Sequence, residues 1–177
     1  MITIFSYNKE ELKKENIEDI EKLDLSKKEK EKRWILVTNM NKLESELLTK
    51  KTNLHPTTIE DFLSTHARIK YEEQEDYTLI IFRAIKKVNA LYITTNTISM
   101  VFGESILMTV CNEENKTIED LLKNETKIKY LLSKGDDFIC HYIMDKEIDK
   151  IMDTKNIIAE DFKEIEKKFV EKPDKEI

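Results

Sequence analysis

The chain has 177 residues, a length that suits one domain with an additional arm. Its 30 basic and 36 acidic side chains give a net charge of −6, which argues against a general nucleic-acid binder. Gly103 and Gly135 are the only glycines, and they lie too far apart for a glycine-rich phosphate-binding loop. The N-terminus has neither a basic segment nor a long apolar run, so we expect no secretion signal and a cytoplasmic location.

The N-terminal part predicts strands and helices in alternation. A charged segment at 26–33 is expected to be solvated, and Pro56 suits the first turn of a helix that follows His55. The expected strands cover residues 2–5 and 34–37, and the expected helices run from Lys9 to about Leu23 with Asn8 as cap, from about Asn41, and from Thr57 to about Thr65.

The middle of the chain predicts β-structure. Its expected strands cover residues 69–71, 77–88, 91–102 and 106–111. From Val88 to Asn112 the only charged residue is Glu104, and the segment is long enough to span a membrane. Polar residues in its middle and a Gly-Glu-Ser sequence near its end favour a β-hairpin instead.

The C-terminal part predicts helices, two short ones at 117–123 and near 128–132, and then one of about 36 residues from Gly135. Apolar residues of the long helix alternate by four and three positions, as in a heptad repeat, with Lys155 in the one polar slot. They are Met144, Ile148, Ile151, Ile158, Phe162, Ile165 and Phe169. Such an apolar seam needs a partner helix, so we expect the chain to belong to a larger assembly.

These elements predict an α/β (α+β) fold, in which a mixed β-sheet with helices packed on it is followed by a long C-terminal helical arm. We divide the chain into a sheet domain, residues 1–134, and an arm, residues 135–177.

The sequence contains no recognisable catalytic motif, so we expect the chain not to be an enzyme. The histidines His55, His66 and His141 have no local partner of the kind that nucleophilic catalysis requires. Cys111 and Cys140 lie in apolar runs and are expected to be buried, reduced thiols rather than ligands of a zinc site.

Carboxylates are the residues with the clearest potential for chemistry. Glu60 and Asp61 are adjacent on a predicted helix and therefore face different directions, so they suit two separate sites. Asp145, Asp149 and Asp153 repeat every four residues and form one acidic stripe on the long helix. Both groups are compatible with a solvated helix face or with a weak site for a hard cation such as Mg²⁺.

The segment from His55 to Ile85 resembles the CorA family of magnesium channels. The matching positions are His55, Pro56, Glu60, Asp61 and His66, followed by Lys70, Glu72, Glu75 and Tyr77. The similarity extends from about Trp34 to the end of the chain, including the predicted hairpin and the long helix. One departure is Ile69, where the family usually has proline.

The resemblance implies the regulatory domain of a homopentameric channel, lying at the cytoplasmic face of the cell membrane. In the family, Mg²⁺ bound between neighbouring domains favours closure of the channel. The resemblance places metal contacts at Glu60, Asp61 and Asp145, and the acidic stripe extends this hypothesis to Asp149. The expected ion is Mg²⁺, with Co²⁺ or another divalent cation as alternatives.

The family's stalk helix, its two membrane spans and its Gly-Met-Asn pore sequence have no counterpart in these residues. We therefore interpret the chain as a cytosolic domain that stops inside a helical hairpin. Two alternatives remain open. One is the cytosolic domain of a related zinc or other divalent-cation transporter, and the other is a stand-alone cytosolic protein that interacts through its arm.

Overall fold

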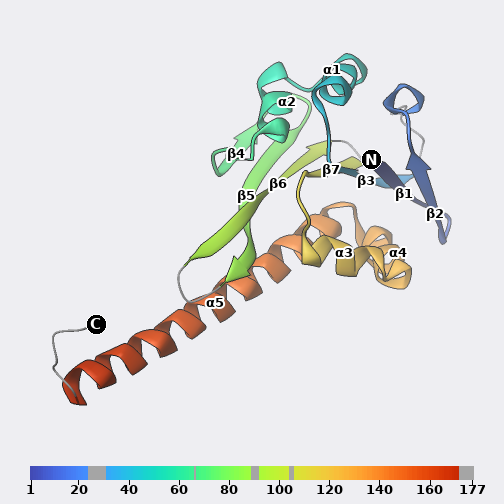
Figure 1. The fold of residues 1–177 in the computed structure, drawn as a ribbon. Helices are drawn as coiled ribbons and strands as arrows, with labels where there is room; N and C mark the ends of the chain where they lie inside the picture. Colours follow the sequence, from blue (N-terminus) through green and yellow to red (C-terminus); the bar gives the residue numbers. More distant parts are fainter. Residues whose placement is uncertain (24–30, 66, 89–91, 104–105, 172–177) are drawn as a thin grey trace.

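The computed structural model describes residues 1–23, 31–65, 67–88, 92–103 and 106–171. Its described strands form one seven-stranded sheet in the order β2-β1-β3-β7-β6-β5-β4, in which β3 and β7 pair in parallel and all other neighbours are antiparallel (Figure 1). The strands are β1 (Ile2–Asn8), β2 (Glu11–Ile17), β3 (Lys32–Thr38), β4 (Lys70–Glu73), β5 (Thr78–Val88), β6 (Ile93–Gly103) and β7 (Ile106–Cys111).

Helices cover both faces of this sheet, so the central strands bury side chains in both directions. In β3, Ile35 and Val37 belong to one core, whereas Trp34 and Leu36 belong to the other. Successive side chains of a strand point to opposite faces, and burial of both faces produces the continuous apolar run of β3. The predicted α/β class with a mixed sheet is therefore confirmed.

The predicted helix from Lys9 to Leu23 is wrong. Residues 11–17 form β2, which pairs antiparallel with β1, and a short 3₁₀ helix, η1 (Ile20–Lys22), follows. The charged composition of the segment suits a helix, but the pairing with β1 places Ile17 in the core and leaves most of the other β2 side chains exposed. Tertiary pairing therefore overrides the local preference.

The prediction of a solvated run at 26–33 is also wrong at its end. Arg33 is only 3% exposed, and its guanidinium Nε lies 3.8 Å from a carboxylate oxygen of Glu31. Arg33 belongs to β3, so the strand begins inside the charged run rather than after it. Residues 26–30 of the run lie outside the described residues.

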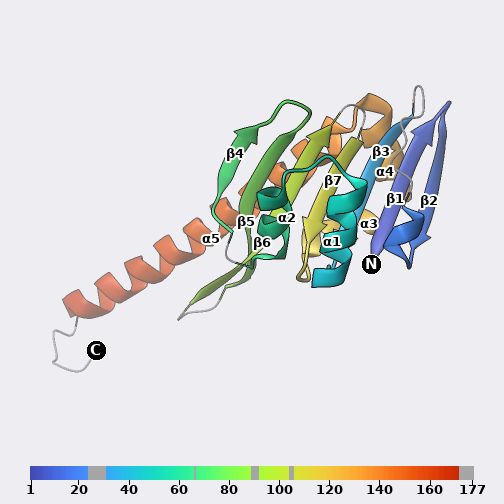
Figure 2. The ribbon, with the colours of Figure 1, turned by 90° about the horizontal axis from the view of Figure 1, so that it is seen from above.

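One face of the sheet carries α1 (Lys42–Lys51) and α2 (Pro56–Leu63), which lie over the strands in Figure 2. Asn41 caps α1 and forms a capping box with Glu44, since each side chain accepts the other's backbone N–H. Leu48 of α1 and Ile59 and Phe62 of α2 are buried against the sheet. Both predicted helices are confirmed in this region.

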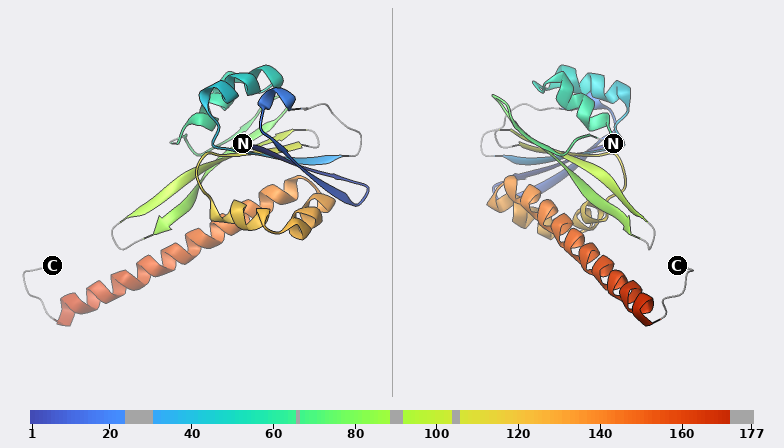
Figure 3. Two further views of the ribbon diagram at one scale, coloured as in Figure 1. Left: turned by 45° about the vertical axis from the view of Figure 1, so that its right-hand side comes forward. Right: turned by 90° about the vertical axis from the view of Figure 1, so that its left-hand side faces the viewer.

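The opposite face carries α3 (Lys116–Leu122), α4 (Glu125–Lys134) and α5 (Asp137–Glu171) (Figure 3). Asn115 and Asn124 cap α3 and α4 by accepting backbone N–H groups in their first turns. Ile118, Leu121, Ile128, Leu132 and Ile139 fill the core between these helices and the sheet.

Helix α5 has 35 residues and leaves the sheet domain as a projecting arm, as Figures 1 and 3 show. Its first turns are buried at Ile139, Cys140 and Ile143, but the predicted apolar seam is mostly exposed, with Phe162 at 67% and Ile165 at 52%. The long helix is therefore confirmed, and a partner for its seam stays a prediction. In the described part of the chain, no helix combines the length and the apolar character that crossing a membrane requires.

Candidate metal-binding residues

Helix α2 presents Glu60 and Asp61, and its own packing determines their direction. Thr58, Ile59 and Phe62 are buried against the sheet, which leaves Glu60 exposed and Asp61 half-buried at the side. The hydroxyl of Tyr77 fixes the start of the helix, since it lies 2.9 Å from Thr58 Oγ1 and accepts the backbone N–H of residue 55 at 3.0 Å. Glu60 and Asp61 therefore diverge, as predicted from their adjacency.

Asp61 has a cationic partner within the chain. Lys70 Nζ, on the edge strand β4, lies 2.6 Å from Asp61 Oδ2 and 3.1 Å from Glu72 Oε2. Burial lowers the pKa of Lys70, but the hydrogen bonds and negative charges of Asp61 and Glu72 outweigh it, so its pKa is raised overall. A cation that binds Asp61 must therefore compete with a firmly protonated lysine.

Asp145 and Asp149 lie on α5, and both are exposed. Lys146 Nζ pairs with Asp149 Oδ2 at 2.9 Å, one helical turn away, and this contact raises the pKa of Lys146. Surface pairs of this kind contribute little to stability. Lys146 therefore offsets part of the repulsion between the aspartates of the stripe.

The structure does not bring the two predicted groups together. Glu60 and Asp61 lie in the helical layer on one face of the sheet, whereas Asp145 and Asp149 lie on α5 in the layer on the other face (Figure 1). The sheet separates them, so a site that used both groups would take them from different copies of the chain. No cluster of three or more His, Cys, Asp or Glu side chains suited to a metal ion occurs among the described residues.

The cysteines and His55 have structural roles. Both cysteines are free and buried, and burial raises the pKa of the Cys111 thiol to about 11 and that of Cys140 to about 12, so both stay protonated near neutral pH. His55 is the N-cap of α2, where its Nδ1 accepts the backbone N–H of Thr57 at 3.3 Å. His141 is exposed on α5, and residue 66 lies outside the described residues.

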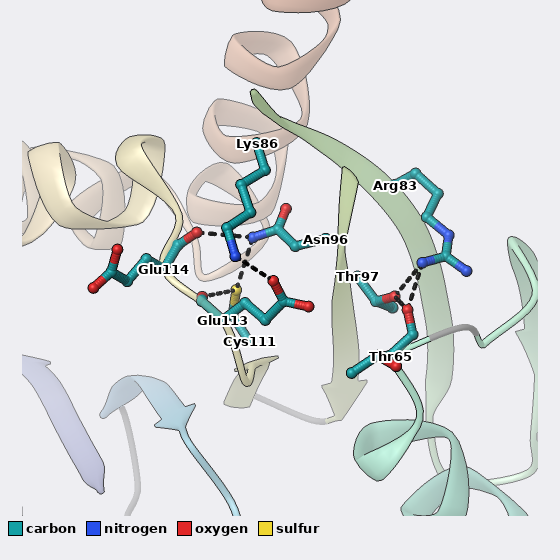
Figure 4. Close-up of polar contacts among 8 residues, drawn as sticks. All are labelled: Thr65, Arg83, Lys86, Asn96, Thr97, Cys111, Glu113 and Glu114. Atoms are coloured by element: carbon teal, nitrogen blue, oxygen red, sulfur yellow. Dashed lines mark hydrogen bonds and ion pairs between the residues drawn. The ribbon is translucent and has the colours of Figure 1, made fainter. Parts of the chain in front are cut away.

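A group of polar contacts near the carboxyl end of β7 was not predicted. Asn96 is fully buried on β6, and its amide donates to the backbone carbonyl of Glu114 at 3.0 Å (Figure 4). Beside it, Lys86 Nζ lies 2.6 Å from a carboxylate oxygen of Glu113, and the Cys111 thiol donates to the backbone carbonyl of Glu113 at 3.1 Å. These contacts attach the segment after β7 to β5 and β6.

Glu147 was also missed, although the sequence contains a signal for it. It follows Ile139 and Ile143 at intervals of four, which is the spacing of the buried face of α5. The structure buries it to 1% exposure.

Comparison with solved structures finds the same fold in a complete magnesium transporter, in the soluble domain of that transporter and in the ZntB cytoplasmic domain. The complete CorA magnesium transporter from Methanocaldococcus jannaschii superposes with a TM-score of 0.71 at 20% identity, over 99% of this chain and 53% of that one. The soluble domain of the same transporter gives 0.66 at 20% identity, over 97% of this chain and 66% of that domain. The ZntB cytoplasmic domain from Vibrio parahaemolyticus gives 0.65 at 13% identity, over 90% of this chain and 64% of that one.

This chain spans about half the length of the complete transporter. A search of curated protein sequences finds no match. At the level of sequence, the family model described as "CorA-like Mg2+ transporter protein" matches residues 29–177. That match covers more than half of the chain, including all but the first two strands of the sheet. The chain therefore belongs to the CorA-like Mg²⁺ transporter family.

Proposed function

We propose that the chain is the regulatory domain of a CorA-type magnesium channel, and that Mg²⁺ bound between neighbouring copies favours the closed channel. The main support is the placement of the predicted carboxylates. Asp61 and Asp145 lie on opposite sides of the sheet and reach the surface, so they can be shared only between copies. Family membership and the fold shared with the CorA domain add to this support.

The ion pair of Asp61 with Lys70 suits a weak, reversible site. In the absence of a metal ion Lys70 neutralises Asp61, and a divalent cation must displace its ammonium group. Mg²⁺ retains several waters and takes few protein carboxylates, so it does not require a preformed cage. A half-buried carboxylate with a competing lysine is therefore compatible with binding at high ion concentration and release at low concentration.

Weak metal sites are sufficient to control a channel gate if several of them act together. At ten times its Kd, one bound ion stabilises the binding state by about 1.4 kcal/mol. Five ions at the interfaces of a pentamer would contribute about 7 kcal/mol, and moving a gate from 1:99 to 99:1 requires about 5.5 kcal/mol. We infer that symmetry multiplies a small effect at each interface into control of the gate.

The proposal requires that the native gene continue beyond Ile177. We expect the downstream sequence to encode a long helix and then two apolar spans with Gly-Met-Asn between them. Sequencing the native locus checks this directly. A gene that ended at Ile177 would exclude a channel and favour a stand-alone protein that interacts through its arm.

The metal site is tested by limited proteolysis of the longer, assembled protein with and without Mg²⁺. Asp61→Ala should remove most of the protection by Mg²⁺ and leave the fold intact, because the side chain lies at the surface of α2. Lys70→Met should retain or increase protection, since it removes the competing ammonium group. Glu46→Ala, on the exposed side of α1, is the matched control and should behave like the native protein.

Equal protection in the Asp61→Ala and native proteins would contradict the site. The chain by itself should show little effect of Mg²⁺, because the neighbouring copy is missing. The same assay with Zn²⁺ and Co²⁺ shows which ions this site binds. The cytosolic domain of a related zinc or other divalent-cation transporter stays the second candidate, because the ZntB cytoplasmic domain has the same fold.

A further inference from the structure

Glu147 occupies a position where the helix pattern requires an apolar side chain. Ile139, Ile143 and Glu147 follow one another at intervals of four on the buried face of α5, and Glu147 is 1% exposed. Only Thr154 is buried further along the helix, and most of the residues after it are exposed. Glu147 therefore lies in the last part of α5 that packs on the sheet domain, shortly before the exposed arm.

The carboxylate of Glu147 has two donors, and both reach the same oxygen. Asn115 Nδ2 donates to Glu147 Oε1 at 3.2 Å, and Lys150 Nζ donates to it at 2.9 Å. Glu147 Oε2 is buried and has no partner among the described residues. A buried carboxylate oxygen without a hydrogen bond is costly, and a well-packed apolar side chain avoids that cost. Stability therefore does not explain a glutamate at this position.

Asn115 links the carboxylate to the sheet domain. Its Oδ1 accepts the backbone N–H of Ile118 at 3.0 Å as the N-cap of α3, while its Nδ2 donates to Glu147. The residues before it are held in turn, because Asn96 donates to the Glu114 carbonyl, and this contact ties the segment to β6 (Figure 4). Asn115 is therefore a rigid anchor, and Glu147 is the arm's polar contact with it.

We propose that Asn115 and Glu147 form a latch that sets the direction in which the arm leaves the sheet domain, with Lys150 as the counter-charge. The remaining contacts of α5 with the domain are mainly apolar, through residues such as Ile139 and Ile143, and apolar contacts have little directional preference. A hydrogen bond does depend on direction, so it can define one orientation of the helix. This inference does not depend on metal binding.

The latch is tested by exchanging its amide and its carboxylate. Asn115→Asp keeps an oxygen that caps α3 but places a carboxylate against Glu147, so the two side chains repel each other. Adding Glu147→Gln supplies an amide donor opposite the carboxylate that Asn115→Asp introduces, so the hydrogen bond can form again. Spin labels at Lys13→Cys on β2 and Lys163→Cys on the arm, both exposed, report the distance between arm and sheet by pulsed electron resonance.

We expect the spin-labelled chain without further substitutions to show one narrow distance distribution. Asn115→Asp should broaden this distribution, and the double variant with Asn115→Asp and Glu147→Gln should make it narrow again. Asn124→Asp is the matched control, because Asn124 caps α4 in the same way and accepts the backbone N–H of Lys127 at 2.9 Å. That variant should keep the narrow distribution. An unchanged distribution in Asn115→Asp, or a folded double exchange that stays broad, would overturn the latch.

Glu147→Leu provides a second test in case Asn115→Asp does not fold. It replaces the carboxylate by an apolar side chain that suits the buried stripe. We expect an unfolding temperature equal to or higher than that of the native chain, together with loss of the narrow distribution. A narrow distribution in this variant would show that packing alone directs the arm.

Discussion

Trp34 combines apolar packing with one buried hydrogen bond in the core. Its ring is fully buried on β3 and stacks on Phe5, with ring centroids 5.2 Å apart. The indole Nε1–H donates to Thr109 Oγ1 on the neighbouring strand β7 at 3.0 Å. The contact joins the two parallel strands from within the core, where a lost hydrogen bond is costly.

Thr109→Val tests this contact. Valine has nearly the same shape but cannot accept the indole N–H, so the free energy of unfolding should fall by about 1–3 kcal/mol. Urea denaturation followed by circular dichroism measures the change. In a Trp34→Phe background the same substitution should be neutral or stabilising, because no donor is left unpaired. An equal loss in both backgrounds would contradict the role of the hydrogen bond.

The candidate metal-binding carboxylates were predictable in part from the sequence. Their pattern predicts helices at Glu60 and Asp61 and at Asp145 and Asp149, and the structure confirms those helices. The pairing of Lys70 with Asp61 was not predictable, because the two residues meet only when β4 joins the edge of the sheet.

At the scale of elements, the β1–β2 hairpin is the clearest case of tertiary control. Its turn residues Lys9 and Glu10 both have positive φ, 46° and 70°. Two positive φ angles in a two-residue loop are typical of a type I′ turn, which matches the twist of paired strands and prefers Asn-Gly. Lys-Glu does not favour such a turn, so the sequence carried no hairpin signal there.

Replacing Lys9-Glu10 by Asn-Gly should therefore stabilise the chain. Side chains at positive φ cost roughly 1 kcal/mol each, and part of this gain is offset by the flexibility of glycine in the unfolded state. We expect the free energy of unfolding to rise by about 1 kcal/mol, measured by thermal unfolding. Glu15→Gly, in the middle of β2, is the control and should be destabilising. A fall in both variants would argue against the turn.

At the scale of the whole molecule, the sheet domain and the arm differ in what stabilises them. The domain has two apolar cores, one on each face of the sheet. The distal part of the arm has no such core within the described residues, since its apolar side chains are largely exposed. An isolated helix of this kind gains little stability by itself, and packing against another helix is what stabilises most helices.

Phe162→Glu should consequently leave the unfolding temperature of this chain almost unchanged, within the range of about 0.5 kcal/mol that is common for surface substitutions. Ile143→Glu is the contrasting variant, because Ile143 is fully buried between α5 and the sheet, and a buried unpaired charge should prevent folding. Thermal unfolding by circular dichroism measures both. A large loss of stability in Phe162→Glu would mean that the distal arm packs on the domain.

The sequence by itself determined the alternation of strands and helices after residue 34, the long C-terminal helix with its apolar seam, and the family through the ordered motif from His55 to Tyr77. These features are local, since periodicity, caps and spacing depend on neighbours along the chain. Only the tertiary structure decided the β1–β2 hairpin, the burial of Arg33, and the separation of the carboxylates on α2 and α5 by the sheet. Each of these depends on contacts between residues far apart in the sequence, where the energy of pairing and burial outweighs local preference.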